Sequence, residues 1–154
     1  MLNVFPRPSG QAFDRTLLQQ RGPLIRVQVG VPSTLAAHLS AAGSQIPQPI
    51  ITGALIDTGA SVSAIDSGEL AKLGLQPTGQ TSLATPSDHQ ATANTFSVSL
   101  TFPQAPAENA TFDPFAVVGC ILRPQGIGAL LGRDFLEIAT LIYNGPGGFF
   151  TLAF

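Results

Sequence analysis

The stretch ALIDTGASVSAID, residues 54–66, places an acid directly after an apolar run and directly before a turn of small residues. The apolar run is typical of a buried strand, and that strand would end at Asp57. A carboxylate at such a position is costly to desolvate, so it needs either a local structural partner or a function. Gly59 permits the sharp backbone turn that follows. An aspartate that only caps its own turn is the competing interpretation.

The composition indicates one strand-rich domain. The chain has 154 residues, of which 44% are hydrophobic and only 10% are charged, with 16 Gly and 13 Pro. An average globular domain has about 25% charged residues, and this low charge with many turn formers favours strands and loops over a helical bundle. The net charge of −2 leaves no basic surface for nucleic acid. No apolar run approaches the roughly 20 residues that span a bilayer. We therefore expect neither a nucleic-acid nor a membrane partner.

The residues that commonly hold cofactors are scarce. Two histidines and one cysteine lie far apart in the sequence, without the spacing of metal ligands. Phosphate-binding glycine loops are also missing. We expect no metal and no cofactor. Cys120 lies in the apolar segment VVGCIL, which favours packing over a reactive thiol, and the N-terminal residues lack the pattern of a signal peptide, which predicts a cytoplasmic protein.

The hydrophobic pattern predicts several strands and short helices. Residues 24–31 alternate as in a half-buried strand, and residues 47–57 are apolar enough for a strand covered on both faces. Residues 33–43, with Ser33 as a possible N-cap, fit either a short helix or a long loop. Residues 66–75 fit a compact helix with Asp66 or Ser67 as N-cap and Gly74 just past its end. The other expected segments are a short strand at 63–66, a hairpin over 81–102, a loop at 104–114, a buried strand at 115–122, a glycine turn and short helix within 126–144, and a final strand within 147–154.

Two motifs together resemble a known family. IDTGAS, residues 56–61, resembles the active-site motif of aspartic peptidases, and LLGRD, residues 130–134, is similar to the second mark of that family. Their order, with a hairpin between them and a terminal strand after them, resembles the retropepsin-like, single-domain branch. The resemblance covers residues 22–154 and leaves residues 1–21 as an N-terminal arm, flexible or at a dimer interface. It implies an all-β fold: a closed acid-protease barrel of the retropepsin type with one or two short helices, in a C2 homodimer.

The resemblance also implies a catalytic residue and a partner. Aspartic peptidase chemistry needs two carboxylates that share one proton and hold one water. The chain supplies one Asp-Thr-Gly motif, so the second carboxylate would be Asp57 of another copy, with a two-fold axis between the two. We therefore expect an aspartic endopeptidase that acts as a homodimer on a peptide or protein substrate.

Other residues receive supporting roles from the same resemblance. Thr58 would brace the partner's loop across the axis, and Gly59 and Ala60 would shape the active-site loop. Gly132 and Arg133 would lie beneath the site as structural residues. In the family this arginine usually pairs with an acid, but the corresponding position here is Ser61. Asp66, Asp134 or a group of the partner chain remain as alternative contacts.

The tip of the expected hairpin, TPSDHQ, would be a flap that closes over a bound peptide. Unlike the flap tips of the family, this tip contains no glycine. The expected substrate contacts are Ala84, Thr85, Pro86, Ser87 and Leu130, with Ile56 and Val62 as further subsite candidates.

Alternatives remain open at two points. The apolar terminal strand, with Phe149, Phe150 and Phe154, either joins an intersubunit sheet or fills the core of one copy. For function, the alternative is a catalytically weak or inactive retropepsin-fold module that dimerises or binds peptides. A third option is an unrelated β-barrel in which Asp57 only caps a turn.

Overall fold

The computed structural model describes residues 2–5, 14–83, 91–105 and 111–154. The strands are β1 (Leu2–Phe5), β2 (Leu24–Gly30), β3 (Ile50–Ile56), β4 (Ala64–Asp66), β5 (Gly79–Leu83), β6 (Ala91–Thr101), β7 (Thr111–Cys120), β8 (Ala129–Leu131), β9 (Thr140–Asn144) and β10 (Phe149–Ala153). The α-helices are α1 (Arg15–Arg21), α2 (Ser33–Ala41), α3 (Ser67–Lys72) and α4 (Arg133–Leu136), and a 3₁₀ turn, η2, spans Arg123–Gln125.

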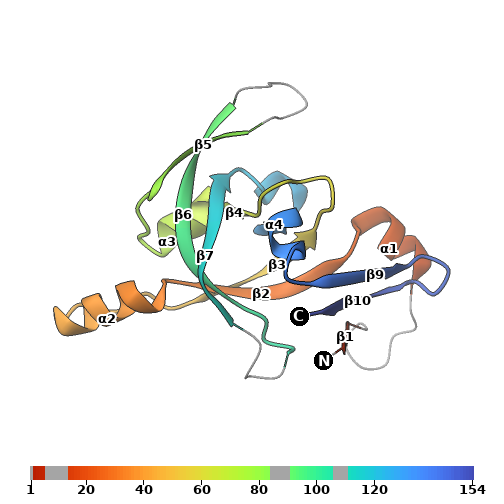
Figure 1. The fold of residues 1–154 in the computed structure, drawn as a ribbon, viewed down its shortest axis with the longest axis horizontal. Helices are drawn as coiled ribbons and strands as arrows, with labels where there is room; N and C mark the ends of the chain where they lie inside the picture. The colour runs from red at the N-terminus through yellow and green to blue at the C-terminus, as the bar shows by residue number, and fades with distance from the viewer. Residues whose placement is uncertain (1, 6–13, 84–90, 106–110) are drawn as a thin grey trace.

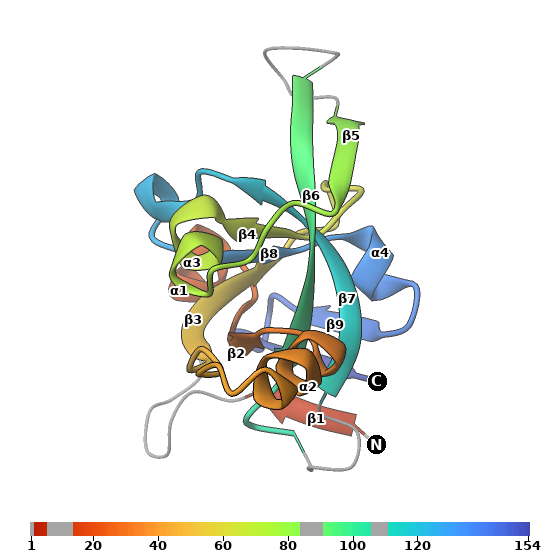
Figure 2. The ribbon, with the colours of Figure 1, turned by 90° about the vertical axis from the view of Figure 1, so that its left-hand side faces the viewer.

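Six strands close into a barrel. The larger sheet has the order β2-β3-β8-β4-β7-β6-β5, and a further pairing of β2 with β6 closes its first six strands (Figure 1). Among the described strands β5 pairs with β6 alone, and the hairpin of these two strands rises above the barrel (Figure 2). The mostly-β barrel and the hairpin that the sequence predicted are thereby confirmed.

Alternation of side chains along the strands builds the core. On β2, Ile25, Val27 and Val29 are buried, whereas Arg26 between them is exposed. This is the period-2 pattern of a strand with one face on the core. At one end of the barrel, the ring of Phe102 lies 5.3 Å from that of Phe135, centroid to centroid. Burial of these apolar side chains is the main favourable term in the folding of the barrel.

The N-terminus of α3 is capped by a local contact, whereas that of α2 depends on a distant one. α3 begins after Asp66, whose carboxylate accepts a hydrogen bond from the Gly68 N–H at 2.9 Å, and Gly74 beyond its end has a φ of 65°. Both features agree with the prediction from sequence. α2 has Pro32 at its N-cap, and the expected cap Ser33 lies inside the helix. The Ser33 N–H donates instead to the Asp113 carboxylate of β7, at 3.0 and 3.2 Å.

Several expected boundaries were wrong. The described residues contain four α-helices rather than one or two. The loop expected at 104–114 ends earlier, because β7 begins at Thr111, opposite Thr101 of β6. Strand β9 was missed within 126–144. The expectation that β3 is covered on both faces also fails, because Ile51 is 61% exposed.

The chain ends form a second sheet of order β1-β10-β9. β1 lies within the expected N-terminal arm, residues 1–21, which also contains α1, capped by the Asp14 side chain. The boundary of that arm stays a prediction. Phe154, just after β10, packs its ring 4.8 Å from Phe102 of the same chain. This contact matches the alternative in which the terminal aromatic residues fill the core of one copy.

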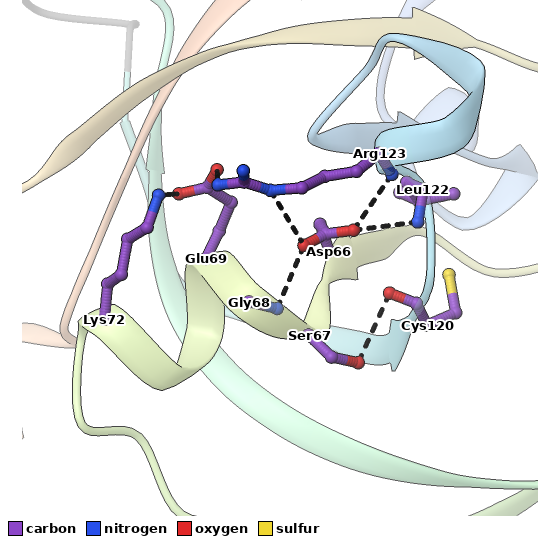
Figure 3. Close-up of polar contacts among 8 residues, drawn as sticks. All are labelled: Asp66, Ser67, Gly68, Glu69, Lys72, Cys120, Leu122 and Arg123. Carbon is purple, nitrogen blue, oxygen red and sulfur yellow. Dashed lines mark hydrogen bonds and ion pairs between the residues drawn. The ribbon is translucent and has the colours of Figure 1, made fainter.

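Asp66 anchors α3 to the turn after β7 (Figure 3). Its carboxylate is buried and accepts hydrogen bonds from the N–H groups of Leu122 at 2.8 Å and Arg123 at 3.0 Å, besides that of Gly68. The Arg123 side chain lies 3.7 Å from Asp66 and 2.9 Å from Glu69, which also pairs with Lys72. Desolvation acts to raise the pKa of Asp66, but the three backbone donors and Arg123 outweigh it and hold this pKa below its usual value.

The environment of Cys120 bears on its expected packing role. Cys120 is half-buried, and desolvation, with a smaller effect of the Asp66 charge, raises the pKa of its thiol. A protonated thiol is a poor nucleophile, in line with the expected packing role.

In the described ranges, the longest helix is α2 with nine residues, and no helix has the length and apolar character to cross a membrane.

Candidate active site

Asp57 lies at the end of two parallel strands. β3 and β8 pair in parallel, with Ile56 opposite Leu131, and the Asp57 N–H then donates to the Leu131 carbonyl oxygen at 2.9 Å. Asp57 itself is half-buried, whereas Thr58 and Gly59 are exposed. The strand pairing therefore fixes the backbone of the acid while the loop after it faces solvent.

The loop folds back on its own aspartate. Asp57 Oδ1 accepts a hydrogen bond from the Gly59 N–H at 2.8 Å, and the Asp57 carbonyl oxygen accepts one from the Ala60 N–H at 3.2 Å. The acid thus caps its own turn, as the competing interpretation of the sequence required. This contact engages one carboxylate oxygen and fixes the direction of the side chain, so it is compatible with a catalytic role.

Gly132 lies directly beneath the loop. A Cβ atom at this position would be 2.7 Å from the carbonyl carbon of Val62, 2.8 Å from its oxygen and 3.1 Å from the Ala60 oxygen. Separations below 3.0 Å from backbone atoms cannot be accommodated without moving the chain. The close approach of β8 to the loop therefore requires glycine here.

Arg133 binds the loop through its backbone carbonyl groups. Its N–H donates to the Ala60 oxygen at 3.0 Å, and its Nη1 donates to the oxygens of Thr58 at 2.9 Å and Gly59 at 3.2 Å. The alternatives left open for Arg133 included Asp66, but that acid pairs with Arg123 instead. Peptide oxygens of the Asp57 loop thus take the place of the acid that the resemblance implied as the partner of Arg133.

Asp134, considered above only as a contact of Arg133, and Ser63, which had no expected role, complete the support. Ser63 is fully buried, and Asp134 accepts from both its N–H, at 2.8 Å, and its hydroxyl, at 2.7 Å. The same hydroxyl accepts from the Gly132 N–H at 3.0 Å. An acid in the first turn of a short helix is a recognisable capping signal, and Asp134 also accepts from the Phe135 N–H. The sequence offered no signal that Ser63 would be its partner.

The predicted substrate contacts divide into three groups. Ala84, Thr85, Pro86 and Ser87 lie outside the described residues. Leu130 is half-buried and packs, together with Val62 and Leu83 of β5, against a small apolar cluster distinct from the main core. Ile56, by contrast, is 3% exposed and belongs to the main core, so the proposal that it lines a subsite was wrong.

The described part of the chain holds no group of three or more His, Cys, Asp or Glu residues placed to bind a metal ion. Thr58 is exposed, and its expected contact across a two-fold axis stays a prediction. Asp57 is therefore a half-buried carboxylate at the start of an exposed loop, and the loop backbone is held by the Leu131 carbonyl oxygen and by Arg133.

Comparison with known proteins identifies this arrangement. Residues 48–135, more than half of the chain, match the family described as aspartyl protease, and this range contains both the Asp57 loop and the supporting residues from Gly132 to Asp134. The chain belongs to the aspartyl protease family. The family resemblance inferred from the two motifs is thereby confirmed.

A solved structure is also similar to this aspartyl protease. It is the crystal structure of a retropepsin-like aspartic protease from Rickettsia conorii, with 20% sequence identity and a TM-score of 0.46. The similarity covers 67% of this chain and 74% of the other. A search of curated proteins gave no match.

Proposed function

We propose that this aspartyl protease is an endopeptidase that acts as a homodimer, with one Asp57 from each copy. The observation that carries the proposal is the single carboxylate on an exposed loop that β8, Gly132 and Arg133 hold in place. A group held so firmly by its backbone is pre-organised for chemistry, and one carboxylate is half of what peptide hydrolysis by this family requires. A second copy supplies the other half by symmetry.

The proposed reaction follows from two carboxylates at close range. Like charges at that distance cannot both ionise, so one Asp57 is protonated and the other is ionised. The ionised carboxylate takes a proton from water, and the oxygen of that water attacks the peptide carbonyl carbon. The protonated carboxyl donates to the carbonyl oxygen, which gives a tetrahedral gem-diol. Proton transfer to the peptide nitrogen then allows the C–N bond to break and releases an acid and an amine.

The substrate would be an extended peptide between the two copies, beneath the β5–β6 hairpins. Half-buried Val62, Leu83 and Leu130 would offer it apolar contacts near Asp57. Gly59, which has no side chain, would allow the peptide backbone to approach the loop. Thr58 would brace the corresponding loop of the partner.

A second candidate is a dimerising or peptide-holding module of the same fold without useful turnover. The sequence of the hairpin tip, TPSDHQ, favours this candidate because it has no glycine, whereas the family's flap tips are rich in glycine. A stiffer tip would close over a peptide less readily.

Cleavage of a diverse peptide library from acidic to neutral pH tests the proposal. The wild type should cut, and Asp57→Asn should not, because the amide cannot exchange the required proton. Asp113→Asn makes the same change at an exposed acid of β7 and should cut normally, since the amide oxygen still accepts from the Ser33 N–H. Cleavage that persists in Asp57→Asn contradicts the mechanism. Failure of the wild type to cut, in a chain that dimerises, supports the binding module.

A further inference from the structure

One peptide unit connects Asp57 to a buried serine. The Leu131 carbonyl oxygen accepts the Asp57 N–H at 2.9 Å, and the N–H of the same peptide unit, from Gly132, donates to Ser63 Oγ at 3.0 Å. The carbonyl and the N–H of a planar trans peptide point in opposite directions. A rotation of this unit that turns its N–H away from Ser63 therefore also turns its carbonyl away from Asp57.

The hydroxyl of Ser63 takes the place of a strand pairing at this point. The described pairing of β8 with β4 ends at Leu130, opposite Ala64. Gly132 lies two residues further along and is buried, so its N–H needs an acceptor within the fold. Ser63 Oγ is that acceptor. Loss of the hydroxyl would leave a buried donor unpaired, which is a cost that the chain could reduce by turning the peptide unit.

Asp134 fixes the direction of that hydroxyl. Its Oδ1 accepts from the Ser63 hydroxyl at 2.7 Å and from the Phe135 N–H at 2.8 Å, and its Oδ2 accepts from the Ser63 N–H at 2.8 Å. A hydroxyl has one proton and two lone pairs. Because the proton points to Asp134, a lone pair is available to the Gly132 N–H. Ser63 is fully buried, so bulk solvent offers its hydroxyl no other direction.

These groups form a chain in which every donor points the same way. It runs from the Asp57 N–H through the Leu131–Gly132 peptide and the Ser63 hydroxyl to the Asp134 carboxylate. Hydrogen bonds in such a series polarise one another, and a charged acceptor makes the last bond a strong one. Asp134 thereby acts on the backbone of Asp57 through Ser63.

Arg133 and Asp134, which are neighbours in α4, hold the acid from two sides. Arg133 donates to the carbonyl oxygens of the two residues that follow Asp57. Asp134, through Ser63, holds the peptide unit that accepts the N–H of Asp57 itself. The first contact fixes the loop after the acid, and the second fixes the backbone of the acid.

We propose that Ser63 is a positioning residue for the reaction at Asp57, and that Asp134 holds Ser63 in the required orientation. The proposal rests on the proposed function, since it gives Ser63 a part in peptide hydrolysis. Displacement of a reacting group by about 1 Å can lower a rate about 100-fold. Ser63 acts through the backbone of Asp57 and is buried away from the peptide, so its loss should change kcat rather than KM.

Steady-state kinetics with a cleaved peptide is the first test, with the folded fraction of each variant measured by urea denaturation. In Ser63→Ala, kcat per folded molecule should fall roughly 10- to 100-fold, while KM changes less than about twofold. Ser63→Thr keeps the hydroxyl and should recover most of the lost kcat. A loss of stability alone would leave kcat per folded molecule unchanged.

Ser67→Ala is the matched control. The Ser67 hydroxyl also donates to a distant backbone oxygen, that of Cys120, at 3.3 Å. Ser67 belongs to α3, however, and has no contact with the chain of hydrogen bonds that ends at Asp134. Both kcat and KM of Ser67→Ala should therefore equal those of the wild type.

A double-mutant cycle tests whether Asp134 acts through Ser63. Asp134→Ala should lower kcat by itself, because the Ser63 hydroxyl loses the acceptor that orients it. The variant with both Ser63→Ala and Asp134→Ala should then be about as slow as the slower single variant, since residues that act as a unit are not additive. Losses that multiply in the double variant would contradict the role of Asp134.

Amide hydrogen exchange gives a readout that does not depend on activity. It is measured on full-length protein with Asp57→Asn, in which the proposed reaction is blocked. Adding Ser63→Ala should speed exchange at the amide of residue 57 relative to the amides of the β2–β3 pairing, because the peptide unit that accepts it is no longer held. A general loss of stability would leave that ratio unchanged.

The outcomes separate this proposal from the function. Unchanged kcat in folded Ser63→Ala, or an unchanged exchange ratio at residue 57, overturns the positioning role, while cleavage by the wild type still supports the peptidase. If Ser63→Ala does not fold, a fall in kcat without a change in KM in Asp134→Ala carries the same test. A wild type that never cleaves peptides contradicts the peptidase and any part for Ser63 in catalysis, and the exchange ratio then shows by itself whether Ser63 holds the backbone of residue 57.

Discussion

The Arg133 guanidinium donates a hydrogen bond to the Thr58 carbonyl oxygen at 2.9 Å, across the turn that begins at Asp57. That carbonyl belongs to the peptide unit whose N–H, on Gly59, donates to Asp57 Oδ1. The next peptide unit repeats the arrangement, with its oxygen on Arg133 and its N–H, from Ala60, on the Asp57 carbonyl oxygen. Arg133 thus orients two successive peptide units, and through them the carboxylate of Asp57.

Replacement of Arg133 should therefore reduce catalysis more than it reduces substrate binding. Arg133→Gln removes the charge, and Arg133→Lys keeps the charge but loses the planar donor group that reaches both oxygens. Hydrogen bonds to charged groups contribute about 1.5–3 kcal/mol, so kcat should fall roughly tenfold or more in Arg133→Gln, with a smaller change in KM. Steady-state kinetics with a cleaved peptide measures both. Arg26→Gln, at an exposed arginine of β2, should leave both constants unchanged; an equal fall there would remove the specific role of Arg133.

Gly132→Ala should damage both the loop and the stability of the fold. The new Cβ would lie 2.7 Å from the Val62 carbonyl carbon, so β8 or the loop must move. Overpacking of this kind typically costs about 1–3 kcal/mol, which urea denaturation measures, and displacement of Asp57 should abolish most of the activity. Gly53→Ala is the control, because a Cβ there meets nothing within 4 Å, and alanine should be neutral or slightly stabilising in β3. Normal activity and stability of Gly132→Ala would show that the loop can shift without loss.

Local signals in the sequence were sufficient for some elements. The helix after Asp66 was predicted with its cap and its C-terminal glycine, because both signals lie within a few residues of the helix. The helix at 33–43 could not be separated from a loop. Its first turn is satisfied by Asp113, 80 residues further along the chain, and no local pattern contains that contact.

The residues of the candidate site also fall into two groups, those with a local signal in the sequence and those without one. Asp57, Gly132 and Arg133 were found because each lies in a motif that resembles the family's. The clamp between Ser63 and Asp134 was missed, since its partners are 71 residues apart and only the fold brings them together. The contacts of Arg133 were left open for the same reason: its acceptors are peptide oxygens, which every residue possesses and which no sequence pattern marks.

Asp66 should make the stability of the fold depend on acid pH. Its pKa in the folded chain lies below the ordinary value of 3.8. Its ionised form therefore contributes stability that is fully present above pH 3.8 and is lost as the pH falls toward the lower folded value. Asp66→Asn should lose roughly 1–3 kcal/mol at pH 7, because an amide turned toward the N–H groups of Leu122, Arg123 and Gly68 satisfies them poorly. The difference in free energy of unfolding between wild type and Asp66→Asn, from urea denaturation at pH 7, 5 and 3, should be constant between pH 7 and 5 and smaller at pH 3.

Asp113→Asn is the control at an exposed acid, and its free energy of unfolding should show no such convergence with that of the wild type. A difference for Asp66→Asn that stays the same down to pH 3 would show that the buried carboxylate contributes by its shape and not by its charge.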